Sequence, residues 1–222
     1  TELIADHASP DVVVVAAGRI KHMAIAMNDV LRSRFDRVDV THARQKSRGL
    51  VARGPHAGSS FEAIASRVHE LPGVGTLTIC AAGGAFAGTG VDIGTRFLIE
   101  QLADASLDAS SAIDFACGTG LVAAWLALRD PSARVLATDV SAAAVTSAQA
   151  TVLANGVADR VGVIQDVGLA SQADESASLI VLNPPFHEGA AINKDLAPEL
   201  FADAARVLAP GGQLWTVWNS HL

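Results

Sequence analysis

The tetrad Asn183-Pro184-Pro185-Phe186 follows directly after the apolar run 180–182. In α/β sheets the chemistry is placed at the carboxyl ends of strands, which is where this tetrad falls. The prolines lack backbone donors and have a fixed φ, so they end the strand and hold the chain rigid. The Asn183 amide and the Pro184 carbonyl then offer two acceptors, and Phe186 offers a flat face on which a base can stack. The alternative interpretation is a plain turn after a strand.

Two acceptors beside a flat apolar face suit one kind of reaction. An exocyclic amine conjugated to a purine is a poor nucleophile, because its nitrogen lone pair is delocalised into the ring. Acceptors that bind the amine hydrogens localise this lone pair toward an electrophilic methyl group. We therefore predict methyl transfer to an amino group, with Asn183, Pro184 and Phe186 as the catalytic residues.

A run of small residues between Asp114 and Gly120 marks a second candidate site, where an apolar strand turns into a helix. Small residues let a ligand approach the backbone, and a helix N-terminus offers free N–H groups. Asp114 lies four residues before Gly118 and can meet an ammonium group of the ligand. A tight turn without a ligand is the alternative. The predicted cofactor contacts in this run are Asp114, Ala116, Cys117, Gly118 and Gly120.

The next two predicted strands end at Asp139 and Asp166, each followed by a valine. Asp139 is placed to accept hydrogen bonds from the two hydroxyls of an adenosine ribose. Asp166, beside Val167, can hold an adenine amino group while Val140 covers a face of the ring. The alternatives are a helix-capping acid for Asp139 and an ordinary loop acid for Asp166.

The glycine pattern alone does not identify the cofactor, because Gly118-x-Gly120-x-x-Ala123 followed by an acid also fits a dinucleotide site. The strand that ends in Asn183 favours S-adenosylmethionine, because a methyl donor bound across the first three strand ends points its sulfonium at the tetrad. Asp114 favours it too, since NAD has no cation there. We therefore predict S-adenosylmethionine as the cofactor and no metal.

The composition fits an intracellular enzyme. A chain of 222 residues is long enough for one full α/β domain and part of another. It contains no apolar run of the roughly 18 to 20 residues that a membrane span needs, and no secretory signal. Its two cysteines, Cys80 and Cys117, lack metal-ligand spacing and favour a reducing compartment. We expect a cytoplasmic protein with no membrane partner.

A net charge of −7 argues against a nucleic-acid partner, but the charge is unevenly distributed. Residues 1–60 carry nine Lys and Arg against six Asp and Glu, whereas 61–222 carry seven against seventeen. We expect any RNA-facing surface in the N-terminal part, with a solvated charged face as the alternative. The excess comes from Arg32, Arg34, Arg37, Arg44, Lys46, Arg48 and Arg53.

The pattern of turn formers divides the chain near residues 54–74, around a predicted short helix at 61–70. Upstream we expect a β-α-β fragment, with strands at 11–16 and 37–41 and a helix at 20–34.

Downstream, strands and helices alternate, which predicts a mostly parallel sheet with helices on both faces. The predicted strands are 77–81, 113–116, 134–138, 160–164, 178–182 and 213–218, and the predicted helices are 92–103, 120–128, 141–154 and 195–208.

The region from about residue 77 to residue 222 resembles the catalytic domain of ribosomal-RNA guanine-N2 methyltransferases of the RsmC and RlmG type. The resemblance implies the Rossmann-like class I methyltransferase fold, guanine N2 of ribosomal RNA as the target, and ribosomal RNA or a ribosomal subunit as the partner. It also implies a degenerate methyltransferase-like domain at the N-terminus that helps to bind RNA. The stretches that carry it are 86–96, 114–120, 183–189, 211–215 and 219–222.

The resemblance divides the chain into a partial N-terminal segment at 1–60, a linker at 61–75 and a catalytic domain at 76–222. Folds of this family normally return through a final antiparallel strand, which we expect this domain to lack. The resemblance also implies that Asp92 and Thr95 hold the methionyl end of the cofactor, with helix capping as the competing interpretation. Ala116 stands where the family usually has glycine.

Several interpretations remain open at this stage. His187 and Glu188 either contact the base and relay a proton or face solvent. The same tetrad suits adenine-N6 methylation of nucleic acid, or methylation of a protein glutamine amide. A cofactor-binding scaffold without turnover is the non-enzyme alternative.

Overall fold

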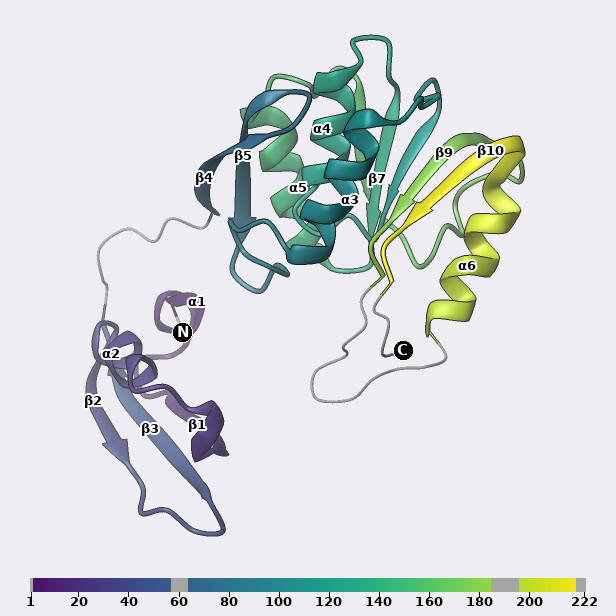
Figure 1. Ribbon diagram of the computed structural model, residues 1–222. Helices are drawn as coiled ribbons and strands as arrows, with labels where there is room; N and C mark the ends of the chain where they lie inside the picture. The colour runs from purple at the N-terminus through teal and green to yellow at the C-terminus, as the bar shows by residue number, and fades with distance from the viewer. Residues whose placement is uncertain (1, 57–63, 185–195, 219–222) are drawn as a thin grey trace. The chain divides into compact units, whose positions relative to one another are not determined.

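The computed structural model describes residues 2–56, 64–184 and 196–218, which are drawn in colour in Figure 1. The chain forms two compact units, Thr1–Glu62 and Ala63–Leu222.

The N-terminal unit is an antiparallel sheet of three strands in the order β1-β3-β2. Its small core consists of Met23, Leu31, Phe35, Leu50 and Ala52. The elements are α1 (Glu2–His7), β1 (Val13–Arg19), the 3-10 turn η1 (Ile20–His22), α2 (Ala26–Arg32), β2 (Phe35–Val40) and β3 (Ser47–Pro55).

Two predictions for this unit need correction. The helix expected at 20–34 is broken, because Met23 adopts an extended backbone and its side chain enters the core between η1 and α2. The two predicted strands exist, but both pair with β3, which we did not predict. A tight turn at Gln45 and Lys46, both with positive φ, folds β3 back onto β2.

The second unit begins with the antiparallel hairpin of β4 (Ile64–Leu71) and β5 (Gly75–Ala82). The helix predicted at 61–70 is therefore wrong over its described part, and strand β4 lies within the stretch we expected to be a linker. Gly73 and Gly75, both with positive φ, reverse the chain. This reversal lets β4 pair along the whole length of β5, and that pairing overrides the local helical pattern.

Strand β5 is not part of the parallel sheet that we predicted it would join. Its outer edge lies against helix α5 (Ala142–Ala154) and the asparagine that follows it. The backbone N–H groups of Thr78, Cys80 and Ala82 donate to the side chains of Asn155, Thr151 and Ser147, at 2.9, 3.0 and 2.8 Å. Polar side chains spaced four residues apart along α5 and its C-terminal end thus accept the hydrogen bonds that a neighbouring strand would otherwise accept.

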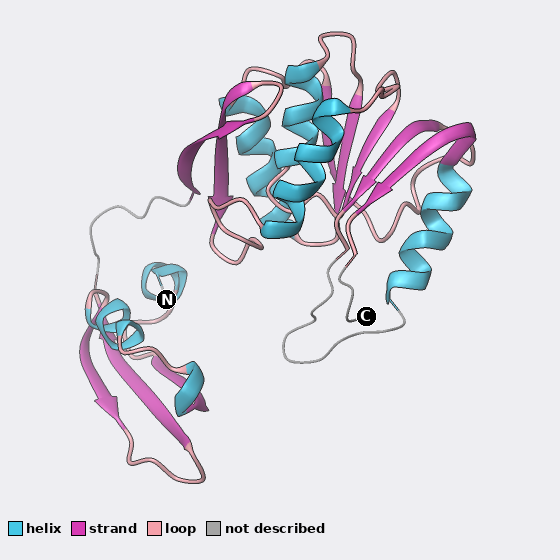
Figure 2. Ribbon diagram, viewed as in Figure 1, coloured by secondary structure: helices cyan, strands magenta, loops and turns pink. Residues whose placement is uncertain are grey.

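The main sheet has five strands in the order β10-β9-β6-β7-β8, and every pair is parallel. This confirms the predicted parallel sheet. Its strands are β6 (Ala112–Phe115), β7 (Val135–Asp139), β8 (Val161–Gln165), β9 (Ala177–Leu182) and β10 (Leu208–Thr216). Helices α3 (Ile93–Asp104), α4 (Leu121–Arg129) and α5 cover one face, and α6 (Leu196–Val207) lies on the other (Figures 1 and 2).

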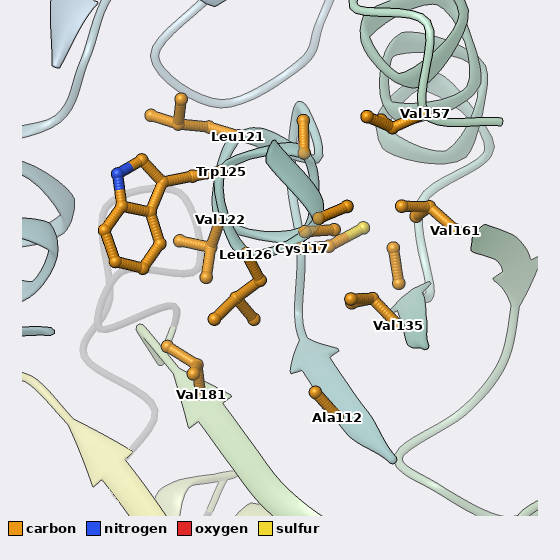
Figure 3. Close-up of a cluster of buried hydrophobic side chains, with 14 of the residues drawn as sticks. Ala112, Cys117, Leu121, Val122, Trp125, Leu126, Val135, Val157, Val161 and Val181 are labelled. Carbon is orange, nitrogen blue, oxygen red and sulfur yellow. The ribbon is translucent and has the colours of Figure 1, made fainter. Parts of the chain in front are cut away.

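Alternate residues of each strand face different helices, as the pleat of a strand requires. In β9, Leu179 and Val181 enter the core against α3, α4 and α5, whereas Ile180 and Leu182 enter the core against α6. Figure 3 shows part of the first core, including Trp125 of α4. The indole N–H of Trp125 donates to the carbonyl of Pro72 at 2.8 Å, which ties α4 to the β4–β5 hairpin.

Strand β10 begins earlier than expected. The predicted turn at 210–212 is a bulge inside the strand, with a register shift between Leu208 and Gln213 and a positive φ at Gly211. Among the helices that the structure describes, none is both long enough and apolar enough to cross a membrane.

Candidate active site

The strand order brings three separate stretches of sequence to one edge of the sheet. Strand β6 lies between β7 and β9, and its last residue, Phe115, pairs with Thr138 and Leu182. Because the strands are parallel, the loops after β6, β7 and β9 leave from the same edge. The segments that begin at Ala116, Asp139 and Asn183 are therefore neighbours.

The loop after β6 contains three residues with positive φ: Ala116 (55°), Gly118 (54°) and Gly120 (71°). A Cβ at Gly118 would meet nothing within 4 Å, whereas one at Gly120 would lie 2.7 Å from the Cβ of Ala148 in α5. Gly118 thus leaves open space for a ligand, and Gly120 is required for the close packing of α4 on α5. Ala116 adopts the left-handed conformation with a side chain, at a cost of about 1–2 kcal/mol.

Asp114 is buried beneath this loop, with 4% of its surface exposed. Its carboxylate accepts a hydrogen bond from the N–H of Ala123 in the first turn of α4, at 2.9 Å. Burial raises the pKa of Asp114 to about 8; the Ala123 hydrogen bond opposes this rise and the charge of Asp139 adds to it. The carboxyl group is thus a buried acid that a cationic ligand would ionise.

Asp139 ties the loop after β6 to the loop after β7. Its carboxylate oxygens accept hydrogen bonds from the N–H groups of Gly118 and Ser141, both at 2.9 Å. Its own carbonyl accepts from the N–H of Asp166 at 3.1 Å. The side chain of Ser141 caps α5, as predicted, by accepting from Ala144. Each Asp139 carboxylate oxygen keeps a lone pair that a hydroxyl group could use.

Asp166 is engaged within its own loop. Its carboxylate accepts hydrogen bonds from the N–H of Val167 at 2.8 Å and from the N–H and hydroxyl of Ser171 at 3.0 and 2.7 Å. Burial alone would raise the pKa of Asp166, but these hydrogen bonds and the charge of Arg206 outweigh it and lower the pKa. This geometry favours the alternative of a loop acid. The neighbouring valines are exposed, Val140 by 63% and Val167 by 74%.

Asn183 follows β9 and contacts the start of α3. Its side-chain NH2 donates to the carboxylate of Asp92 at 3.2 Å and to the hydroxyl of Thr95 at 2.9 Å. The same Asp92 oxygen accepts from the N–H groups of Gly94 and Thr95, so Asp92 is the N-cap of α3. The capping interpretation of Asp92 is therefore confirmed, and its contact with Asn183 was not predicted.

Half of the predicted site residues line one small cavity of about 60 Å³. It brings together Asp92, Thr95, Asp114, Ala116, Cys117, Gly118 and Asn183. Pro184, Gly120, Asp139, Val140, Asp166 and Val167 do not line it: Pro184 is buried, and Asp139, Val140, Asp166 and Val167 stand at the ends of β7 and β8. Phe186, His187 and Glu188 lie outside the residues that the structure describes, so their predicted roles stay predictions.

Part of the wall of this cavity was not predicted from the sequence; it is formed by Phe86, Ala87, Gly90, Thr119, Leu121 and Val122. The sequence contained a signal for it, because the stretch that precedes α3 is rich in glycine. In the structure, Ala87 of this stretch has a positive φ of 59°. Phe86 is 69% exposed, so this wall offers an apolar face.

A larger cavity, of about 500 Å³, lies at the opposite edge of the sheet, where Ala112, Val135 and Val161 begin their strands. Of the cations that line it, Arg160 donates to the carbonyls of Ala127 and Asp130, and Arg134 donates to carbonyls of its own turn. These side chains hold loops through their hydrogen bonds. The cavity is remote from the carboxyl ends of the strands, where the predicted site lies. Among the described residues no group of three or more His, Cys, Asp and Glu could hold a metal.

Comparison with known proteins gives concordant matches. Residues 76–222 match the family model "Methyltransferase small domain". The chain is 36% identical over 216 residues to the ribosomal RNA large subunit methyltransferase G of Pseudomonas paraeruginosa, which covers 96% of the chain and 56% of the relative. It is 43% identical over 139 residues to the protein of the same name from Streptomyces coelicolor, covering 63% of the chain and 37% of the relative. The chain thus spans little more than half the length of the first of these relatives.

One solved structure is similar over nearly the whole chain. It is the T. thermophilus 16S rRNA N2 G1207 methyltransferase (RsmC) in complex with AdoMet and guanosine. The similarity has a TM-score of 0.76 at 23% identity and covers 98% of this chain and 59% of that one. At this identity the likeness establishes the fold, which confirms the expected Rossmann-like class I methyltransferase fold.

Proposed function

Because the chain belongs to the methyltransferase small domain family, we propose that it transfers the methyl group of S-adenosylmethionine to an exocyclic amino group, guanine N2 of ribosomal RNA. Membership of this family supports the resemblance stated from the sequence. Relatives named as ribosomal RNA methyltransferases support the substrate class.

The orientation of the Asn183 amide is the observation that carries this proposal. Its NH2 group donates to Asp92 and Thr95, which leaves the oxygen as the acceptor end of the amide. Asn183 lines the same cavity as Asp114 and Gly118. Asn183 thus borders the same cavity as the glycine loop, and we infer that its oxygen binds a hydrogen of a purine amine there and localises the nitrogen lone pair.

The residues around the glycine loop fit the cofactor. The buried carboxyl of Asp114 suits the ammonium of the methionyl part, and the space at Gly118 admits the ligand against the backbone. The free acceptor capacity of Asp139 suits the ribose hydroxyls, and the exposed side chains of Val140 and Val167 suit the faces of an adenine ring. S-adenosylmethionine bound there supplies the electrophilic methyl group.

These residues act mainly by positioning. Asn183 and the carbonyl of Pro184 align the amine, and Phe186 stacks the base. A dedicated general base is not required, because the amine loses its proton readily once it is methylated. The small cavity then encloses the methionyl end alone, while the adenosine lies across the exposed ends of β7 and β8.

The hairpin between β2 and β3 is the candidate surface for RNA. Arg44 and Lys46 are exposed at its turn, and neither forms an ion pair with any described residue. Phosphate binding would neutralise these charges. We further propose a cytoplasmic location, because the described cysteines, Cys80 and Cys117, are free and buried.

Methylation of ribosomal RNA that lacks its native modifications tests this function, using the full-length protein and tritiated cofactor. Digestion and mass analysis will distinguish N2-methylguanosine, the expected product, from N6-methyladenosine. We expect Asn183→Ala to reduce kcat at least about a hundredfold, on the order of 3 kcal/mol in the barrier. Gln149→Ala, on an exposed position of α5, is the control and should retain full activity. Activity of Asn183→Ala within threefold of the parent would refute the proposed role.

A further inference from the structure

Whether Asn183 accepts hydrogen bonds from a substrate or donates them depends on which end of its amide faces the cavity. The oxygen and nitrogen ends of an asparagine amide have nearly the same shape, and one accepts hydrogen bonds while the other donates. An amide turned by half a rotation would present two donors to the target amine and repel its hydrogens. Packing around the side chain cannot distinguish these two orientations, so a polar partner must.

We propose that Asp92 and Thr95 are positioning residues that hold the Asn183 amide with its oxygen available to the target amine. This inference rests on the proposed function. It identifies the two residues that determine which end of the Asn183 amide faces the target amine. Asp92 Oδ2 lies 3.2 Å from Asn183 Nδ2, and Thr95 Oγ1 lies 2.9 Å from the same nitrogen. One nitrogen thus contacts both partners.

Asp92 determines the orientation because an ionised carboxylate only accepts hydrogen bonds. In the reversed amide, the oxygen of Asn183 would face the Asp92 carboxylate at the same short distance, and the two would repel each other. Thr95 cannot select an orientation by itself, because a hydroxyl both donates and accepts. Its role is to fix the distance and the plane of the amide.

The first turn of α3 holds Asp92 in place. The Asp92 oxygen that contacts Asn183 also accepts from the N–H groups of Gly94 and Thr95, at 2.9 and 3.3 Å. The N-terminus of a helix carries a partial positive charge, which attracts the carboxylate of Asp92. The charge of Asp92 also polarises the Asn183 amide and makes its oxygen a stronger acceptor. A helix cap therefore serves as an orienting group for a residue that follows β9.

Three substitutions test this proposal on the full-length protein. Asp92→Asn keeps a good N-cap for α3 but can present either a donor or an acceptor to Asn183. Thr95→Val keeps the shape and removes the acceptor, and Thr95→Ser restores the hydroxyl. We expect kcat to fall at least tenfold in Asp92→Asn and Thr95→Val and to stay within threefold of the parent in Thr95→Ser. KM for RNA and the Kd for S-adenosylmethionine should stay within threefold in all three.

A double-mutant cycle separates positioning from other roles. If Asp92 and Thr95 act through Asn183, then adding Asp92→Asn or Thr95→Val to Asn183→Ala should reduce kcat no further. A further drop in kcat, or a rise in the Kd for S-adenosylmethionine with kcat unchanged, would overturn the proposal and favour direct contact with the cofactor.

The same cycle distinguishes failure of this inference from failure of the proposed function. If the parent protein transfers no methyl group to ribosomal RNA, the proposed function is wrong, and if Asn183→Ala keeps the activity of the parent, the proposed role of Asn183 is wrong. If Asn183→Ala loses activity while Asp92→Asn and Thr95→Val keep it, the function stands and the positioning role is wrong. Thermal unfolding of each variant will show whether α3 has been destabilised.

Discussion

Replacing Asp114 with asparagine should stabilise the folded protein and weaken its affinity for S-adenosylmethionine. Burial raises the pKa of Asp114 to about 8 from the ordinary value of 3.8. The folded state therefore retains a proton that the unfolded chain releases, and the free energy of unfolding falls as the pH rises from 3.8 to about 8. Asparagine still accepts the hydrogen bond from Ala123 and cannot ionise. The free energy of unfolding of this variant therefore does not fall in this way as the pH rises.

The size of the effect follows from the linkage between pKa and stability. Each unit of difference in pKa corresponds to about 1.4 kcal/mol, so ionisation of Asp114 in the unfolded chain, which the buried carboxyl group does not undergo, lowers the free energy of unfolding by about 4 kcal/mol at pH 7. The advantage of Asp114→Asn should be close to zero at pH 4 and increase by about 1.4 kcal/mol for each pH unit up to about pH 8.

Urea unfolding at pH 4, 5, 6, 7 and 8 measures this difference, with Asp104→Asn on the exposed end of α3 as the control. The control should show no such increase with pH. Calorimetry on the parent protein should show proton release on binding of S-adenosylmethionine below pH 8 and an affinity that rises with pH, and both should be absent in Asp114→Asn. A stability gain that is the same at pH 5 and pH 8 would refute the raised pKa of Asp114.

Three further predictions concern single loops. Ala116→Gly should raise the free energy of unfolding by about 1 kcal/mol, because glycine adopts a φ of 55° without strain. Gly120→Ala should lower it by about 3 kcal/mol or more, since its Cβ would overlap Ala148; Gly118→Ala should cost only about 1–2 kcal/mol yet abolish cofactor binding. Reversing the charges of Arg44 and Lys46 to glutamate should weaken RNA binding and reduce the slope of log K against log salt by about 1.5.

Each of these predictions has a matched control. Ala150→Gly, in the middle of α5, should lose about 1 kcal/mol, opposite in sign to Ala116→Gly. Equal losses of stability in Gly118→Ala and Gly120→Ala, measured by urea unfolding, would contradict the distinct roles of the two glycines. Arg67→Glu on the exposed face of β4 should leave RNA binding unchanged; if it weakens binding as much as the hairpin variant does, the hairpin has no special role.

The elements of the main sheet could be predicted from the sequence because their signals are local. Strands β6 to β9 are short apolar runs, and α5 has both its cap at Ser141 and its stop at Asn155 and Gly156. The strand order then places the carboxyl ends of β6, β7 and β9, with Asp114, Asp139 and Asn183, at one edge. The hairpin β4–β5 could not be predicted in this way, because its strand pairing and its contacts with α5 join residues that are distant in sequence.

The sequence by itself determined which residue types stand at the strand ends, since strand periodicity, glycine turns and Asn-Pro-Pro-Phe involve neighbouring residues. Only the tertiary structure decided what each of them contacts. Asp166 closes its own loop, and Gly118 faces open space whereas Gly120 packs against Ala148. Asn183 binds Asp92 across 91 residues of sequence. Such contacts depend on how whole helices and strands pack together, and no local pattern of residues encodes them.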